Sequence, residues 1–289
     1  MPDDDRRHRL PEAPDPLPVP VVDNHAHLDI VRDDGPSLPL EEAIGAAARV
    51  GVDRIVQIGC DVESARASVG MAHRFPGIVA GVALHPNEIP RLAARGALAE
   101  AYAAIDALAA DPRVRVIGET GLDYYRTGPE GRDLQHEAFR WHIALAKRTG
   151  KVLQIHDRDA HADVLAILDG EGAPRHTVMH CFSGDMAFAR ACLERGFWLS
   201  FAGPVTFKNN HALRDALAVT PLDRVLIETD APYLTPMPWR GAVNSSYLLP
   251  HTVRAAAGVL GVATATLCAA VSDTAERLYG PWWPAAANV

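Results

Sequence analysis

Two histidines separated by one residue, His25 and His27, follow an apolar run near the start of the chain. Because side chains alternate along a strand, both imidazoles are expected on the same side, where they could bind one metal ion. The plain alternative is a pair of polar residues in a loop, and a lone His-x-His motif does not decide between the two.

A carboxylate at the end of another apolar run, Glu119, is expected to be buried. Gly118 and Gly121 stand close to it and allow a near approach of the backbone. A buried charge needs a cation or hydrogen-bond donors, because leaving it unpaired is costly. Either a metal ion or a neighbouring arginine would satisfy Glu119.

Three further potential ligands, His156, His180 and Asp230, also stand where apolar runs end. A single histidine in such a place is usually a hydrogen-bonded structural residue, but all six residues together favour a metal site. Six nitrogen and oxygen ligands are too many for one tetrahedral ion and suit two ions about 3.5–4 Å apart, with one bridging carboxylate. Zn²⁺, Mn²⁺ and Fe²⁺ fit a set rich in imidazoles better than Mg²⁺ does.

These residues need a scaffold that brings several strand ends together. Strands are predicted at 19–24, 54–59, 78–84, 114–119, 152–156, 177–180, 198–202 and 225–229. Amphipathic helices are predicted at 40–50, 62–75, 97–110, 132–149, 160–168, 186–195, 210–219, 249–260 and 266–278. Eight alternations predict an α/β fold, a (β/α)8 TIM barrel whose active site lies at the carboxyl ends of its strands. An open doubly wound sheet is the alternative, but the first strand lacks the glycine-rich phosphate turn of such sheets.

The composition favours one such domain between two tails. The chain has 289 residues, of which 48% are hydrophobic and 22% charged, as in ordinary globular proteins. Length alone suggests two domains, but α/β barrels reach about 250 residues as one. We predict a disordered tail at 1–19, a barrel hydrolase domain at 20–280 and a second tail at 281–289.

Several classes of protein are excluded or disfavoured. The four cysteines have no Cys-x-x-Cys spacing, which argues against a disulfide scaffold and a structural zinc cluster. We find neither a secretory signal nor a membrane-spanning stretch, so we expect a cytoplasmic protein. Nothing in the sequence implies an obligate protein partner. The net charge of −8 disfavours a broad nucleic-acid-binding surface. Two divalent ions and two carboxylates would still leave the site at about +2, which suits an anionic phosphodiester.

Six segments, which follow one another in the order of the family's motifs, resemble the TatD family of metal-dependent hydrolases, within the amidohydrolase-like barrels. They are Asp23–Asp29, Ala83–Glu88, Gly118–Tyr125, Gln154–Ala160, Met179–Gly184 and Glu228–Leu234. Gln135 and Phe139 also match the family pattern, and the resemblance covers residues 20–280. It implies a (β/α)8 fold, a two-metal site and hydrolytic activity, often that of a DNA exonuclease.

The resemblance also implies a role for each matching residue. His25, His27 and Asp230 would hold the first metal ion. Glu119 would bridge the two ions, and His156 and His180 would hold the second. His85 and Arg158 lie in family motifs and would contact the substrate or its phosphate.

One segment departs from the family pattern. Where the family usually has Arg-Gly-x-x-Asn-Glu-Pro, this chain has Arg240–Ser246, so that Ser245 and Ser246 replace the Glu-Pro pair. Losing the proline should loosen the start of the next helix. Losing the glutamate removes a charge near the site. The metal ligands are unaffected, so we expect the substrate, not the metal site, to differ from that of the family's nucleases.

The leading expectation is hydrolysis of DNA phosphodiester bonds from an end, in the manner of a 3'-5' exonuclease, with single-stranded DNA favoured. A metal-bridging hydroxide would attack phosphorus, with Glu119 and Asp230 as the catalytic carboxylates. The candidate DNA contacts, besides His85, are Arg158, Arg240, Lys208 and one of Tyr124 and Tyr125, which could stack on a base. Solvated loop charges and ordinary packing are the plain alternatives for these residues.

Two other functions stay open. The same metal site could hydrolyse a small-molecule amide, lactone or ester, and the changed Ser245–Ser246 stretch and the acidic balance favour this reading somewhat. A non-enzymatic binding barrel is the third reading. The presence of all six candidate ligands argues against it.

Overall fold

Eight parallel strands form one sheet in the order of the sequence, from β1 to β8. A computed structural model describes residues 9–32 and 35–282 of the chain. The strands are β1 (Val21–Ala26), β2 (Val52–Gly59), β3 (Ile78–Val82), β4 (Val114–Asp123), β5 (Val152–Arg158), β6 (Thr177–Met179), β7 (Trp198–Phe201) and β8 (Val225–Ile227). The predicted α/β fold, a (β/α)8 TIM barrel, is confirmed.

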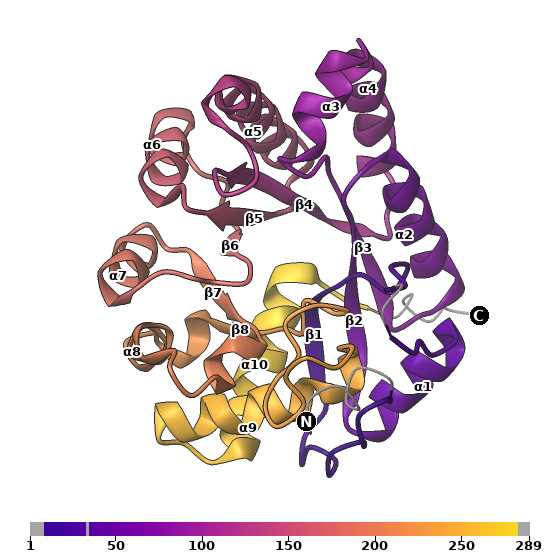
Figure 1. The fold of residues 1–289 in the computed structure, drawn as a ribbon, viewed down its shortest axis with the longest axis vertical. Helices are drawn as coiled ribbons and strands as arrows, with labels where there is room; N and C mark the ends of the chain where they lie inside the picture. Colours follow the sequence, from indigo (N-terminus) through magenta and orange to yellow (C-terminus); the bar gives the residue numbers. More distant parts are fainter. Residues whose placement is uncertain (1–8, 33–34, 283–289) are drawn as a thin grey trace, which may run out of the picture. The chain divides into compact units, whose positions relative to one another are not determined.

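Helices follow the strands along the chain (Figure 1). The α-helices are α1 (Leu40–Arg49), α2 (Val62–Arg74), α3 (Glu88–Ala94), α4 (Leu98–Ala109), α5 (Pro129–Thr149), α6 (His161–Glu171), α7 (Met186–Glu194), α8 (His211–Ala218), α9 (Leu249–Leu260) and α10 (Thr264–Tyr279). The short 3-10 helices are η2 (Gly203–Thr206), η3 (Leu222–Arg224) and η4 (Ser246–Leu248). The sequence interpretation missed α3, whose seven residues are too few to show a clear helical period.

The chain divides into two compact units, which we describe separately. The first comprises the described residues up to Val56, together with Gly184–Leu193 and Leu199–Arg277. The second comprises Gln57–Ser183, Glu194–Trp198 and the described residues from Leu278 onwards.

In the first unit, the first strand lies beside the last. A parallel bridge joins Ala26 to Ala231 just beyond β8. The backbone N–H of His27 donates to the carbonyl of Ala231 at 2.8 Å, and that of Asp230 donates to the carbonyl of His25 at 3.0 Å. These bonds bring two ligand-bearing segments, more than 200 residues apart in the sequence, to one place.

Both predicted tails are partly described. Residues 1–8 and 283–289 lie outside the described residues. Within the first unit, the Leu17 N–H donates to the Val50 carbonyl at 2.9 Å, and the Tyr247 hydroxyl donates to the Pro11 carbonyl at 2.8 Å. In the second unit, Trp282 is buried and its carbonyl accepts from Arg113 at 2.6 Å.

In the second unit, β4 and β5 are paired over most of their length, from Val116 opposite Val152 to Asp123 opposite Arg158. The strand β4 continues four residues beyond its predicted end at 119, because this pairing extends to Asp123. At Gly121 the φ angle is +138°, and a Cβ atom would lie 2.1 Å from the carbonyl oxygen of His156. Only glycine permits this approach, so the register of the two strand ends depends on it.

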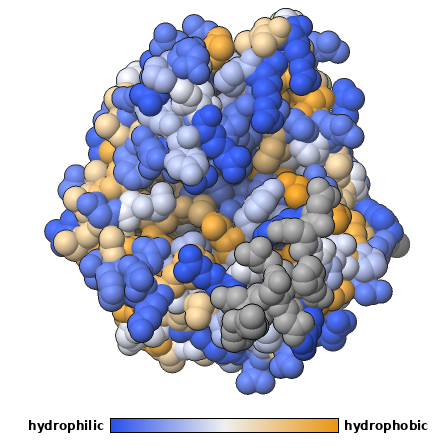
Figure 2. Space-filling model, in the orientation of Figure 1, coloured by the Kyte–Doolittle hydropathy of each residue, from blue (hydrophilic) through white to orange (hydrophobic). Residues whose placement is uncertain are grey.

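Helices α5 and α6 lie beside β4 and β5 (Figure 1). The surface over α3, α4 and α5 is mainly hydrophilic (Figure 2). One face of α5 is buried, with Gln135, Phe139, His142 and Ala146 recurring at helical spacing. Because this face carries polar side chains as well as apolar ones, it both packs the core and positions backbone groups near the strand ends.

No single helix in residues 9–32 and 35–282 has the length and apolar character needed to cross a membrane. One bent pair, Ser246–Leu260 with Thr264–Tyr279, passes that test only when the two parts are taken together, and they meet at 107°.

His142 on α5 is a fully buried neutral histidine. Its Nε2 accepts from the Leu84 N–H at 3.1 Å, and its Nδ1 donates to the Ala138 carbonyl at 2.8 Å. Burial lowers the pKa of His142 from 6.5 to about 4, although the bond to Ala138 opposes this shift. The unfolded chain therefore binds a proton at this residue at a higher pH than the folded chain does.

We expect this difference to make the protein acid-sensitive. As the pH falls from 6.5 to about 4, the free energy of unfolding should fall by up to about 3 kcal/mol on account of His142. Urea unfolding of the wild type and His142→Gln, which keeps an acceptor but does not titrate, should show a shallower pH dependence in the variant. His211→Gln, at an exposed site, is the control. Equal pH dependence in wild type and His142→Gln would contradict the assignment.

Candidate metal centre

The first unit brings His25, His27 and Asp230 into one group. The two imidazole Nε2 atoms lie 3.3 Å apart, and they lie 3.8 Å and 3.6 Å from Asp230 Oδ1. The alternation of β1 places the two rings on one side, and the loop after β8 supplies the carboxylate. All three side chains are buried or nearly so.

These distances fit a metal ion. A triangle with these sides has one point about 2.1 Å from all three atoms, which is the length of a zinc–nitrogen bond. Imidazole nitrogen and carboxylate oxygen are ligands of Zn²⁺, Mn²⁺ and Fe²⁺. Asp230 adopts φ +53°, a left-handed conformation uncommon for a residue with a side chain, so its carboxylate is held in place by its surroundings.

A second buried carboxylate, Asp23, lies two residues before His25. Its oxygens accept from the Thr229 N–H at 2.9 Å, from the Thr229 hydroxyl at 2.6 Å and from the Ser246 hydroxyl at 2.7 Å. Burial raises the pKa of Asp23 to about 6, while the bonds from Ser246 and Thr229 oppose the rise and the charge of Glu228 adds to it. Asp23 thus fastens β1 to the segment that carries Asp230.

Asn244 shapes the same segment from the other side. Its side-chain amide donates to the carbonyl of Thr229 at 2.9 Å and to that of Tyr233 at 2.6 Å. These two bonds enclose the turn that holds Asp230. The asparagine of the Arg-Gly-x-x-Asn pattern therefore supports a candidate metal ligand.

The Ser-Ser replacement also acts here. Ser246 is buried and its hydroxyl donates to Asp23, which no proline could do. The sequence interpretation expected the change to affect only helix entry and the mouth of the site. The structure places it directly behind the strand of His25 and His27, as a hydrogen-bond donor to their supporting carboxylate.

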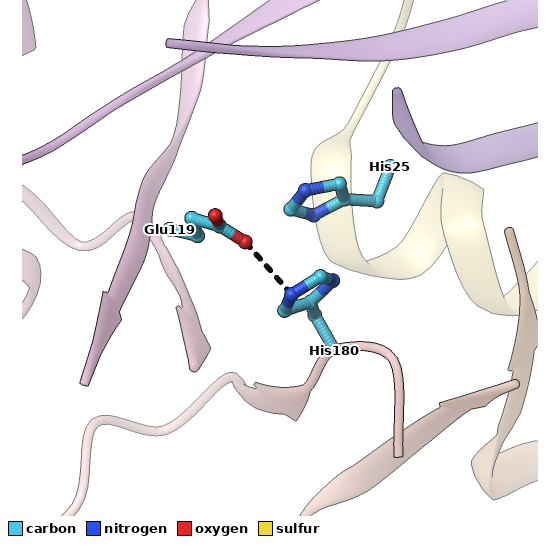
Figure 3. A group of neighbouring side chains, drawn as sticks. All are labelled: His25, Glu119 and His180. Atoms are coloured by element: carbon cyan, nitrogen blue, oxygen red, sulfur yellow. Dashed lines mark ion pairs between the residues drawn. The ribbon is translucent and has the colours of Figure 1, made fainter. Parts of the chain in front are cut away.

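In the second unit, the buried Glu119 is surrounded by imidazoles. Its Oε2 lies 2.7 Å from His180 Nε2, the contact marked by the dashed line in Figure 3, and 3.9 Å from His156 Nδ1. Its Oε1 lies 3.2 Å from His85 Nε2 and accepts from the Cys60 thiol at 3.7 Å. Both oxygens of one carboxylate therefore face potential ligands.

Not all of the expected ligands of this unit form one compact group. His85, Glu119 and His156 have ligand atoms that all lie within 4.8 Å of one another. The rings of His156 and His180 are stacked with centroids 5.9 Å apart, and each approaches Glu119 separately. His85, expected to contact substrate, is thus as close to Glu119 as a ligand would be.

Asp123 holds His156 from its far side. Its Oδ2 lies 3.3 Å from His156 Nε2 and accepts from the Asn87 side chain at 2.9 Å. Burial would raise the pKa of Asp123, but hydrogen bonds from His156, Asn87 and the Arg126 N–H outweigh burial and hold the pKa well below its usual range. A carboxylate hydrogen-bonded to one imidazole nitrogen fixes the orientation of the ring, so that the other nitrogen, Nδ1, could bind a metal ion.

The position of Asp123 is itself set by α5. Gln135 accepts from the Asp123 N–H at 3.0 Å and donates to the Pro86 carbonyl at 3.1 Å and the Thr127 hydroxyl at 2.8 Å. This one buried amide joins the ends of β3 and β4. Gln135 therefore has a structural role, whereas the sequence alone showed only that it matches the family pattern.

The expected substrate contacts fall in both units. In the second, Tyr125 is 66% exposed and the guanidinium carbon of Arg158 lies 3.9 Å from its ring centre. In the first, Arg240 is exposed and stacks on Phe207 at 4.4 Å. Lys208 is exposed as well.

Two residues near the ligands were given no role from the sequence. Tyr233 is 42% exposed and makes an edge contact with the His27 ring at 6.2 Å between centroids. Cys60 approaches Glu119 as described above. Tyr233 lies in a quoted family segment, which could have drawn attention to it, whereas nothing in the spacing of Cys60 indicates its place.

The bond from Ser246 to Asp23 predicts a measurable effect. Ser246→Ala leaves a buried carboxylate short of one donor, so we expect a loss of about 1–3 kcal/mol in the free energy of unfolding. We also expect about tenfold weaker metal binding by the group of His25, His27 and Asp230, since partners of ligand-bearing segments affect affinity on this scale. Chemical denaturation and calorimetric Zn²⁺ titration measure the two quantities.

Ser245→Ala is the matched control. The neighbouring serine begins η4 without a side-chain capping bond, so its removal should change both quantities little. If the two variants behave alike, the Ser246 hydroxyl does not support the site.

Comparison with known proteins identifies the family of the chain. The family profile described as TatD related DNase matches residues 22–280. An uncharacterized metal-dependent hydrolase of Mycobacterium tuberculosis, TatD, is 43% identical over 269 residues, covering 91% of this chain and 99% of the relative. The Bacillus subtilis relative YabD, described in the same words, is 38% identical over 260 residues, covering 90% and 98%. The crystal structure of YjjV, a TatD homologue from Escherichia coli, superposes with a TM-score of 0.80 at 22% identity, covering 90% of this chain and 97% of YjjV. The chain therefore belongs to the TatD family of metal-dependent hydrolases.

Proposed function

We propose that this hydrolase is a deoxyribonuclease that uses two metal ions to cleave DNA phosphodiester bonds from an end. The main support for two metal ions is that each unit has its own group of candidate ligands. One is His25, His27 and Asp230, and the other surrounds Glu119. Single-stranded DNA as the favoured substrate, a 3'-5' direction and a cytoplasmic location are parts of the proposal.

The ligands are assigned as follows. His25, His27 and Asp230 would hold the first ion, and His156 and His180 the second, with Glu119 as the bridging carboxylate. His85 would join them, because its Nε2 lies 3.2 Å from Glu119 Oε1. Zn²⁺, Mn²⁺ or Fe²⁺ suits these donors better than Mg²⁺.

When bound, the ions would acidify a water molecule and offset the charge on the phosphoryl oxygens. The chain's own groups do the rest. Asp230, whose side chain is 14% exposed, would accept the proton of the attacking water at its carboxylate. As in all phosphodiester hydrolysis, the water oxygen bonds to phosphorus while the bond to the leaving alcohol oxygen breaks.

Outer residues keep these groups in position. Asp123 fixes the ring of His156, and Asp23 fastens the strand of His25 and His27. Because each fixing carboxylate is buried and hydrogen-bonded, little reorganisation is needed when substrate binds.

Hydrolysis of a small-molecule amide, lactone or ester is the second candidate. The observation in its favour is the segment around Ser245, where the family's glutamate is absent. A DNA substrate should bind more weakly as salt rises, because phosphate contacts release counterions, whereas a neutral substrate should not.

The proposal predicts that Glu119 is essential. Glu119→Gln should lower cleavage of single-stranded DNA by at least about 100-fold, since losing a ligand costs more than losing its outer partner. It should also lower the number of metal ions retained per chain, measured by elemental analysis after gel filtration. Glu137→Gln, at an exposed position on α5, should change neither.

A substrate panel completes the test. Metal-loaded wild type should be given single-stranded DNA labelled at either end, double-stranded DNA, RNA, an aryl phosphodiester and simple amides and esters. Full cleavage by Glu119→Gln would overturn the metal assignment. Turnover of an amide or ester without any cleavage of DNA would select the second function.

A further inference from the structure

Two consecutive tyrosines after β4 have different surroundings. The Tyr124 hydroxyl donates to Asp163 Oδ2 at 2.5 Å and lies 2.5 Å from His136 Nε2. The guanidinium of Arg132 lies 4.0 Å from the centre of the Tyr124 ring. Tyr124 is therefore anchored to α5 and α6. Its neighbour Tyr125 is 66% exposed, which is unusual for so large a ring.

Arg158 covers one face of this exposed ring. Its guanidinium carbon lies 3.9 Å from the ring centre of Tyr125. The Tyr124 N–H donates to the Arg158 carbonyl at 2.9 Å, and Asp123 lies opposite Arg158 in the paired strands. The backbone under both side chains is thus fixed before any ligand arrives.

Stacking leaves most of the guanidinium's binding capacity unused. A stacked guanidinium contacts the ring with its face, while its N–H donors point outward in the plane and suit a phosphate. In the part of the chain that the structure describes, Arg158 has no ion pair with a carboxylate. The second face of the Tyr125 ring has no ring or cation stacked on it among the same residues.

The strand spaces Arg158 from the candidate metal ligand. His156 and Arg158 are two residues apart on β5, so their side chains leave the strand on one face, from Cα atoms about 6.6 Å apart. The residue between them, Asp157, points the other way, where it meets His161 Nδ1 at 2.8 Å and the Ala160 N–H at 3.3 Å. Arg158 is thus next to His156 along the strand, on the same face as the candidate ligand.

We propose that Arg158 and Tyr125 form a binding subsite for the nucleotide next to the scissile phosphate. The Arg158 guanidinium binds the neighbouring phosphate, and the open face of Tyr125 stacks on the attached base. This inference depends on the proposed function, in which His156 holds an ion at the scissile phosphate. It identifies the substrate as a strand with at least two phosphates, not an isolated phosphodiester.

The first test compares substrates on metal-loaded wild type. The dinucleotide dTpdT has only the scissile phosphate, while pdTpdT and dTpdTp each carry a neighbouring phosphate on one side. One of the latter two should have a kcat/KM about tenfold above that of dTpdT, through a lower KM. An aryl phosphodiester serves as the substrate without a neighbouring nucleotide.

The second test compares variants. Arg158→Ala should remove the preference for the additional phosphate and reduce the slope of log KM against log salt by about 0.7, the contribution of one phosphate contact on a single strand. Tyr125→Leu should lower kcat/KM on a decathymidylate about 5- to 100-fold, while Tyr125→Phe, which keeps the ring, should restore it. Arg148→Ala, which removes a positive charge in the last turn of α5, is the control.

The outcomes separate the two proposals. If wild type cleaves neither the oligonucleotides nor the aryl phosphodiester, the proposed function is wrong. If it cleaves them but Arg158→Ala lowers activity on dTpdT and on the phosphorylated dinucleotides equally, with an unchanged salt slope, the subsite is wrong and the nuclease proposal stands. Equal losses in Tyr125→Leu and Tyr125→Phe would remove the stacking role.

Discussion

The buried carboxylate of Asp23 is the constraint on which the first group of ligands depends. It lies in β1 and accepts from both the backbone and the hydroxyl of Thr229, which directly precedes Asp230. A buried charge held by several donors cannot shift without losing some of them, and each loss is expensive in a low-dielectric interior. The positions of His25 and Asp230 are therefore coupled through a residue that itself has no reason to touch substrate.

In the second unit, the candidate ligands are held in position by strand pairing together with a buried carboxylate. There the pairing of β4 with β5 sets His156 opposite Gly121, a glycine that permits the approach of the two backbones. Glu119 lies where that pairing is irregular, between Ile117 and Thr120. Asp123 then fixes the outer nitrogen of His156, and Gln135 fixes Asp123. In each unit, a carboxylate that is not itself a candidate ligand fixes the position of the candidate ligands. This carboxylate accepts a hydrogen bond from a neutral side chain, Ser246 for Asp23 and Asn87 for Asp123.

The sequence predicted the repeating features and the grouping of His25, His27 and Asp230, and it missed the contacts that support the ligands. Alternation along β1 was enough to place His25 and His27 on one side, and the repeat of strands and helices was enough for the barrel. The contact of Ser246 with Asp23 joins residues 223 positions apart, and no local pattern encodes it. The approach of His85 to Glu119 likewise depends on the end of β3 lying beside β4, which only the folded chain shows.

The Ser-Ser replacement illustrates why family motifs should be interpreted through contacts. Judged by residue type, losing Glu-Pro alters charge and helix entry, and so points to the substrate. Judged by contacts, Ser246 donates to Asp23, the carboxylate behind two candidate metal ligands, while the side chain of Ser245 makes no capping bond. A change in this segment can therefore alter how firmly a metal ion would be held by His25, His27 and Asp230 without altering any of these three residues.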